Sequence, residues 1–147
     1  APYYKEIFGL VEAVLTTHFE DIVSLNVEAM RHVCSYLEIP FEYQIFSKMD
    51  IQIDDIFGPG DWAFNICKAM NADGYINPVS GQDLFDPLKF KNAGISLEFL
   101  KISQMQYPQK KAVFLDNLSI IDVLMFNSPK DVHVMLDHIT LIPGKEV

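Results

Sequence analysis

The sequence has few basic residues, few cysteines and no long hydrophobic run, and each shortage excludes a class of protein. Its 147 residues include 11 Lys and Arg against 20 Asp and Glu, which gives a net charge of −9. Nucleic-acid binding depends mainly on cations that replace the counterions of phosphates, so we expect no DNA or RNA partner. No window approaches the roughly 20 apolar residues of a membrane-spanning helix, so we expect no membrane insertion.

The cysteines and histidines exclude further kinds of site. Cys34 and Cys67 are too few for a disulfide framework, and the first residues lack the anatomy of a signal peptide. Both observations favour a reduced, cytoplasmic setting. The four histidines follow no metal-ligand spacing, and the phosphate-loop, nucleophile-elbow and dinucleotide-binding signatures are absent. The sequence therefore predicts no metal site and identifies no cofactor.

The order of elements predicts the fold class. Helical spacing of apolar residues predicts helices at 3–18, 26–38, 62–72, 87–92, from Ser119 through 126, and from Ser128 through Ile139. Alternating residues predict strands at 41–46, 74–76 and 95–102, and the acidic segment 47–60 reads as an exposed, mobile loop. Strands that alternate with helices favour parallel pairing. We expect one α/β domain over 1–147, with a short, mainly parallel sheet, helices packed on it and C-terminal helices.

Two loops and one helix start carry the candidate binding residues. Parallel sheets bind ligands beyond the carboxyl ends of their strands. In 77–81, Asn77 offers a donor and an acceptor, and Gly81 lets a ligand approach the backbone; an ordinary strand-to-helix turn is the alternative. In 103–111, Tyr107, Gln109 and lysines are suited to a polyhydroxyl or nucleotide ligand; a solvated loop is the alternative.

The helix that follows residue 119 begins with a polar pair. Ser119 is expected to cap it, and Asp122 places a negative charge at its positive end. A catalytic Asp122 is the competing hypothesis, and it would require a buried carboxyl group.

Three segments resemble those of the WbqC-like protein family. The first is Tyr-Ile-Asn-Pro at 75–78, followed by Gly81 and by Leu-Phe-Asp at 84–86. The second runs from Phe90 to Leu100 and includes Gly-Ile at 94–95 and Phe-Leu at 99–100. The third is Leu-Ser-Ile-Ile-Asp-Val-Leu-Met-Phe-Asn at 118–127. The opening Ala-Pro-Tyr-Tyr and Cys34 with Tyr-Leu at 36–37 fit as well, so the resemblance runs through nearly the whole chain. Family members usually begin with a further segment, so we expect this chain to be the C-terminal part of a longer protein. Many members have Gly where this chain has Ser80, so we do not expect Ser80 to be a nucleophile.

The resemblance implies a bacterial enzyme that transfers a group, such as glycine or another amino-acyl unit, to a sugar in O-antigen or surface-polysaccharide biosynthesis. A non-catalytic sugar-nucleotide-binding or scaffold subunit of the same pathway is the alternative. Asp122 is then catalytic, and the residues that bind the small-molecule or nucleotide-sugar substrate are Tyr75, Asn77, Gly81, Tyr107, Gln109 and Ser119. We expect the Asn77 turn and the Gln109 loop to meet at one rim of the sheet. Apolar surface left by the missing segment would allow a homodimer.

Overall fold

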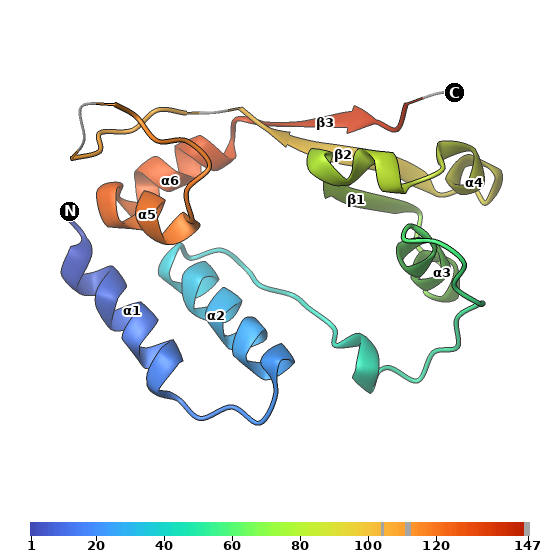
Figure 1. The fold of residues 1–147 in the computed structure, drawn as a ribbon, viewed down its shortest axis with the longest axis horizontal. Helices are drawn as coiled ribbons and strands as arrows, with labels where there is room; N and C mark the ends of the chain where they lie inside the picture. Colours follow the sequence, from blue (N-terminus) through green and yellow to red (C-terminus); the bar gives the residue numbers. More distant parts are fainter. Residues whose placement is uncertain (104, 111–112, 146–147) are drawn as a thin grey trace. The chain divides into compact units, whose positions relative to one another are not determined.

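The chain folds into two compact units that each contain two separate stretches of sequence. The computed structural model describes residues 1–103, 105–110 and 113–145. Unit 1 comprises Ala1–Lys48 and Gln104–His138, and unit 2 comprises Met49–Ser103 and Ile139–Val147 (Figure 1). The expectation of one domain over 1–147 stays a prediction. None of the helices in the described residues is long and apolar enough to cross a membrane.

Unit 2 contains a three-stranded mixed sheet of β1 (Gly74–Pro78), β2 (Ser96–Ile102) and β3 (Ile139–Pro143). The central strand β2 pairs in parallel with β1 and antiparallel with β3. The α/β class is thereby confirmed, but the prediction of a mainly parallel sheet is wrong. The last helix ends before Ile139, and the β-branched segment that begins there forms β3. The backbone groups of this segment bond to β2, and Ile142, for example, pairs with Phe99.

The sheet packs against helices through an aromatic core. Helix α3 (Asp61–Ala69) precedes β1, while the 3₁₀ helix η2 (Val79–Leu84) and helix α4 (Pro87–Asn92) lie between β1 and β2. Phe90 of α4 and Phe99 of β2 are fully buried, and Phe64 packs on Phe90 with ring centroids 5.1 Å apart. The predicted cap at Asp86 is confirmed, since its carboxylate accepts from two backbone N–H groups of α4.

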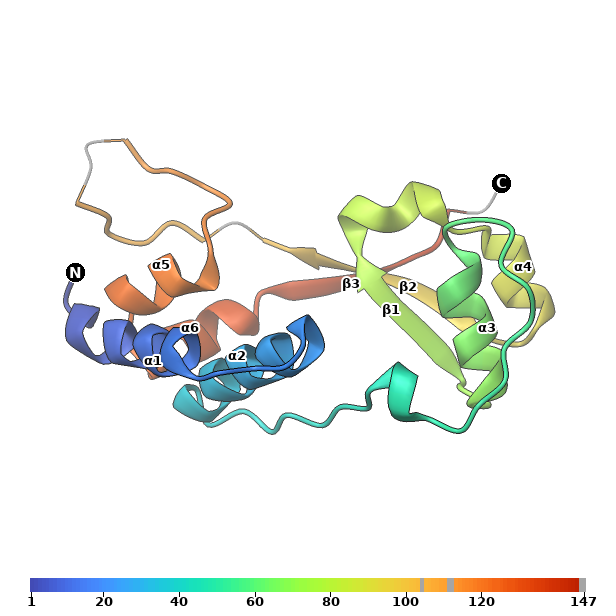
Figure 2. The same ribbon diagram turned by 60° about the horizontal axis from the view of Figure 1, so that its bottom comes forward.

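Unit 1 is helical. Helices α1 (Tyr4–Thr16) and α2 (Ile22–Tyr36) lie side by side, and α5 (Ile120–Phe126) and α6 (Pro129–Leu136) pack with them (Figures 1 and 2). One core joins all four elements, and its buried residues are Ile7, Leu37, Leu124 and Val132. His133 of α6 also places Nε2 2.6 Å from the Leu37 carbonyl oxygen, at the end of α2. The predicted C-terminal helices are confirmed.

Two local predictions in this unit are wrong. Residues 41–45 form no strand, and a short 3₁₀ helix, η1 (Phe46–Lys48), follows them. Alternation alone cannot make a strand, because backbone groups need a neighbouring strand to bond to, and the sheet described above consists of other segments. Helix α2 begins at Ile22 rather than at 26, because Asp21 accepts a hydrogen bond from the Ser24 backbone N–H at 2.7 Å.

The acidic loop before α3 is anchored near its end, and the predicted mobility of 47–60 stays a prediction. Asn65, which is buried in α3, donates to the carbonyl oxygens of Asp54 and Asp55 at 3.0 and 3.2 Å. Asp61 accepts from the backbone N–H groups of Phe57 and Gly58, both at 2.9 Å. It also forms an ion pair with Lys89 of α4. The Lys89 ammonium holds the pKa of Asp61 below its usual range, with the backbone donors adding to the effect.

Replacement of Gly60 by Ala is expected to destabilise unit 2. A Cβ at Gly60 would overlap the backbone oxygen of Leu84 and lie 3.3 Å from the Phe85 ring. Since a backbone oxygen cannot rotate away, we expect Gly60→Ala to lower the free energy of unfolding by about 1–3 kcal/mol. A Cβ at Gly9 would meet nothing within 4 Å. Gly9→Ala in α1 is therefore the control and is expected to stabilise by about 0.5–1 kcal/mol. Denaturant unfolding measures both, and equal stability of the two variants would contradict the steric argument.

Candidate functional site

A tyrosine and an asparagine are hydrogen-bonded to each other at the end of β1. Tyr75 and Asn77 are two residues apart and therefore point to the same side of the strand. The Tyr75 hydroxyl donates to Asn77 Oδ1 at 3.0 Å, and Asn77 Nδ2 donates to the Pro78 carbonyl oxygen at 3.0 Å. Both side chains are half-buried. The amide of Asn77 is thus held in one orientation.

The Tyr75 ring is itself held by the core of unit 2. Its centroid lies 5.3 Å from that of Phe85 and 6.0 Å from that of Phe90. Burial raises the pKa of Tyr75, and the nearby Cys67 thiol adds to the shift. The phenol therefore remains protonated and keeps donating to Asn77 at neutral pH.

Gly81 completes this group of predicted residues. A Cβ at position 81 would overlap Asn77 Nδ2 and lie 3.8 Å from the Leu84 side chain. The absence of a side chain at Gly81 therefore leaves the space that the Asn77 amide occupies. The structure brings Tyr75, Asn77 and Gly81 together, and we call these three residues the β1-end site.

A second pair of predicted residues meets in unit 1. The Tyr107 hydroxyl donates to Asp122 Oδ2 at 2.6 Å, which is the short distance typical of a hydrogen bond to a carboxylate. The Tyr107 ring packs edge-on against Phe114, with centroids 5.4 Å apart, and lies 6.3 Å from the Phe126 ring. Burial raises the pKa of Tyr107, and the Asp122 carboxylate raises it further, while the Gln109 amide opposes the shift. We call Tyr107 and Asp122 the tyrosine–aspartate pair.

Ser119 and Gln109 hold the segments that carry this pair. Ser119 caps α5, as predicted, because its hydroxyl accepts from the Ile121 backbone N–H. The Gln109 amide forms two hydrogen bonds of 2.9 Å with the backbone of Leu115, one from its Nε2 and one to its Oε1. The sequence pattern missed this clamp, because an exposed loop gives no signal for which backbone groups an amide will reach. Substrate contacts by Ser119 and Gln109 stay a prediction.

The predicted site residues thus fall into two sets. Tyr75, Asn77 and Gly81 belong to unit 2, whereas Tyr107, Gln109, Ser119 and Asp122 belong to unit 1. A common rim for the Asn77 turn and the Gln109 loop stays a prediction. Among the described residues, no group of three or more His, Cys, Asp or Glu side chains is placed to hold a metal ion.

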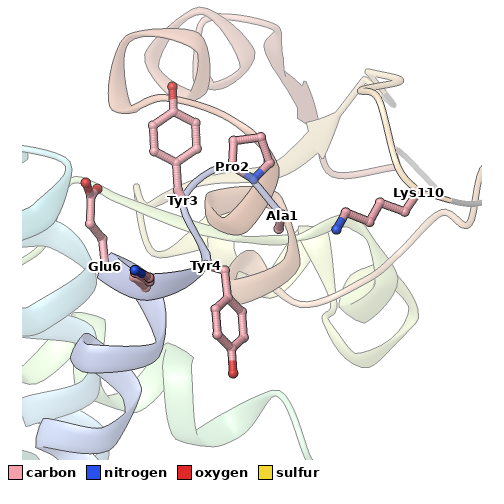
Figure 3. A pocket seen from close by; sticks show the side chains of 7 residues that line it. Ala1, Pro2, Tyr3, Tyr4, Glu6 and Lys110 are labelled. Atoms are coloured by element: carbon pink, nitrogen blue, oxygen red, sulfur yellow. The ribbon is translucent and has the colours of Figure 1, made fainter.

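A cavity of about 580 Å³ lies in unit 1 near the loop of the tyrosine–aspartate pair. It is lined by residues 1–6 and by Lys110, whose side chain extends toward Ala1 (Figure 3). The Tyr3 and Tyr4 phenols, the Lys5 ammonium and the Glu6 carboxylate are further polar groups of the lining residues. Tyr107 and Asp122 do not line this cavity, although Lys110 is only three residues from Tyr107. Sequence patterns gave no sign of this cavity, because 1–6 and Lys110 are far apart along the chain.

The comparison with protein families finds one match. A model of the WbqC-like protein family matches residues 1–134, which include every predicted site residue. No curated protein matches the chain. No solved structure matches it either.

Replacement of Gly81 by Ala is expected to displace the Asn77 amide without unfolding unit 2. The clash falls on the end of a side chain, which can rotate, so we expect a small change in stability and a loss of the hydrogen bond to Pro78. The NMR signals of the Asn77 side-chain amide measure this directly. In the control Gly74→Ala, the new Cβ makes only ordinary contacts of 3.5 Å with Ser96. Unchanged Asn77 signals in Gly81→Ala would contradict the proposed packing.

Removal of the Asp122 charge is expected to lower the pKa of Tyr107. Asp122→Asn keeps the shape of the side chain but removes the negative charge that opposes ionisation of the phenol. Burial still holds the pKa above its ordinary value. NMR titration of the six tyrosines measures the shift. Tyr36, whose hydroxyl lies 3.4 Å from Glu6, is the internal control and should titrate as before. A Tyr107 titration that does not move would show that the pair does not form.

Proposed function

Since the chain belongs to the WbqC-like protein family, we propose that it takes part in bacterial O-antigen or surface-polysaccharide biosynthesis as a cytoplasmic group transferase. The transferred group is glycine or another amino-acyl unit, and the acceptor is a sugar carried on a nucleotide or present as a small molecule. The hydrogen bond between Tyr107 and Asp122 is the observation that carries the proposal. It places a carboxylate and a phenol, which are common acid–base groups, in one half-buried position.

Asp122 is the proposed general base. A carboxylate has about four lone-pair positions, and the hydrogen bond from Tyr107 uses one of them. The carboxylate can therefore also accept a proton from the sugar amine or hydroxyl group. As that proton leaves, the sugar nitrogen or oxygen bonds to the carbonyl carbon of the acyl donor, and the bond from this carbon to its leaving group breaks. The leaving group takes up the proton that Asp122 accepted, and the carboxylate is restored.

Tyr107 is the proposed positioning residue for Asp122. Its ring is fixed by Phe114 and Phe126, and its hydroxyl fixes one oxygen of the carboxylate. Gln109 holds the same loop through Leu115, and Ser119 holds the start of α5. A base that is held in one orientation loses little freedom when the substrate arrives, which lowers the barrier.

The β1-end site is the proposed contact for a hydroxyl-rich ligand. An asparagine amide can form about four hydrogen bonds, and Tyr75 and Pro78 account for two of them. The remaining N–H and lone pair match the donor and acceptor character of a sugar hydroxyl. Gly81 supports this role, because it leaves room for the Asn77 amide.

A non-catalytic sugar-nucleotide-binding or scaffold subunit is the second candidate. The observation that favours it is the use of Gln109 and Ser119 by the protein itself. The Gln109 amide and the Ser119 hydroxyl are bonded to the backbone and so cannot move with a substrate during a reaction. A surface that only binds a ligand does not need such movement.

Asp122→Asn should abolish transfer if Asp122 is the base. Removal of a general base typically costs about 10²–10⁴-fold in rate, so we expect a loss of this size with a melting temperature close to that of the wild type. Tyr107→Phe should cost less, because the carboxylate remains. The exposed Asp137 of unit 1 provides the control Asp137→Asn. Mass spectrometry of a panel of nucleotide sugars incubated with glycyl donors measures the product.

The same panel separates the two candidates. Binding at a hundredfold excess over the dissociation constant stabilises a protein by roughly 2.7 kcal/mol, so nucleotide sugars that bind should raise the melting temperature. Asn77→Ala should remove this shift. A shift without product would favour the binding subunit, and full activity of Asp122→Asn would exclude Asp122 as the base.

A further inference from the structure

Helix α1 is apolar on two of its faces. Ile7 is buried in the core of unit 1 and Val14 is buried on the same face, as expected for an amphipathic helix. On a second face, Tyr4, Phe8 and Leu15 expose 49%, 47% and 72% of their surface. Val11 lies between them in the helix and is half-buried. We call Tyr4, Phe8, Val11 and Leu15 the α1 stripe.

The spacing of the α1 stripe is that of a coiled-coil seam. Its residues are separated by four, three and four positions, which is the a/d pattern of a heptad repeat. Isolated exposed apolar residues are ordinary, but a continuous row at this spacing buries its surface when another helix packs along it. The rings of Tyr4 and Phe8 already pack together, with centroids 5.6 Å apart. The stripe therefore has the spacing and exposure of a surface on which another helix can pack.

We propose that the α1 stripe binds the α1 stripe of a second copy of this chain, with the two helices antiparallel. A two-fold axis that crosses between Phe8 and Val11 brings each Phe8 opposite the Val11 of the other copy. The same axis brings each Tyr4 opposite the Leu15 of the other copy. Because the contact is isologous, one stripe supplies both sides of the interface.

Charge complementarity selects this partner and this direction. Lys5 and Glu12 are exposed and follow Tyr4 and Val11 directly, so both border the same side of the stripe. In an antiparallel pair, equivalent sides of the two helices lie together, and Lys5 approaches Glu12 of the second copy twice by symmetry. A parallel pair does not bring these sides together. The other border of the stripe is formed by Ile7 and Val14, which are already buried within unit 1.

A cavity at one end of the stripe fits the same arrangement. It has a volume of about 370 Å³ and lies where α1 turns into α2, and its lining includes Val14, Leu15, Phe19 and Leu25. Leu15 is the stripe residue that faces Tyr4 of the second copy in the antiparallel pair. Thr17, Glu20 and Asp21 line it as well, and the apolar part of the lining gives the Tyr4 ring a place to pack. This interface is independent of the proposed chemistry, since no stripe residue belongs to either set of site residues.

Sedimentation velocity of the 147-residue chain over a wide range of concentrations tests the proposal. We expect a reversible monomer–dimer equilibrium. Phe8→Ser should raise the dissociation constant at least about tenfold, because two aromatic side chains per dimer lose their burial. Phe57→Ser is the matched control, since Phe57 is 89% exposed in the acidic loop of unit 2. A chain that stays monomeric, or a control that weakens the dimer equally, would overturn the proposal.

A charge exchange tests the antiparallel direction of the two α1 helices and leaves the apolar residues of the stripe unchanged. Lys5→Glu and Glu12→Lys should each weaken the dimer, because each places like charges together. The double variant should restore it. Both residues are exposed, so the variants are expected to fold, and far-ultraviolet circular dichroism checks this. A double variant that dimerises no better than the single variants would exclude the antiparallel pair.

Discussion

Unit 2 depends on the pairing of β2 on both of its edges. This strand joins β1 in parallel and β3 antiparallel, and it buries Phe99 completely between them and the helices. Because β3 comes from 139–143, the end of the chain completes a sheet that began sixty-odd residues earlier, at Gly74. The aromatic core on α3 and α4 then fixes Tyr75, and through Tyr75 it fixes the Asn77 amide. The β1-end site thus depends on the aromatic core that packs against the sheet.

Both sets of candidate residues contain the same arrangement: a half-buried tyrosine is hydrogen-bonded to a polar side chain and orients it. Tyr75 donates to an amide oxygen, and Tyr107 donates to a carboxylate. In each case aromatic neighbours hold the ring, and burial raises the pKa of the phenol, so the hydroxyl remains a donor at neutral pH. The partners differ in chemistry: an amide can only bind, whereas a carboxylate can also accept a proton. This difference underlies the separate roles we propose for Asn77 and Asp122.

The two faces of α1 connect folding with association. One face completes the core of unit 1, and the other presents the α1 stripe. Gly9 lies in the same helix with open space around it, although glycine weakens helices. A helix with this composition gains stability when its second face is covered. Association through the stripe would therefore add to the stability of unit 1 as well as set the oligomeric state.

Local chemistry in the sequence determined the features that depend on near neighbours. The caps at Asp86 and Ser119, most of the helices and the strand at 95–102 follow from residues a few positions apart. The family resemblance follows from short motifs that are spread along the chain. Tertiary structure alone decided the features that need distant partners. Residues 41–45 form no strand, whereas 139–143 form one. The fold also brings Tyr107 to Asp122 and Asp61 to Lys89. A strand or a polar pair is stable only when the fold brings its partner within hydrogen-bonding distance, and no local pattern encodes that encounter.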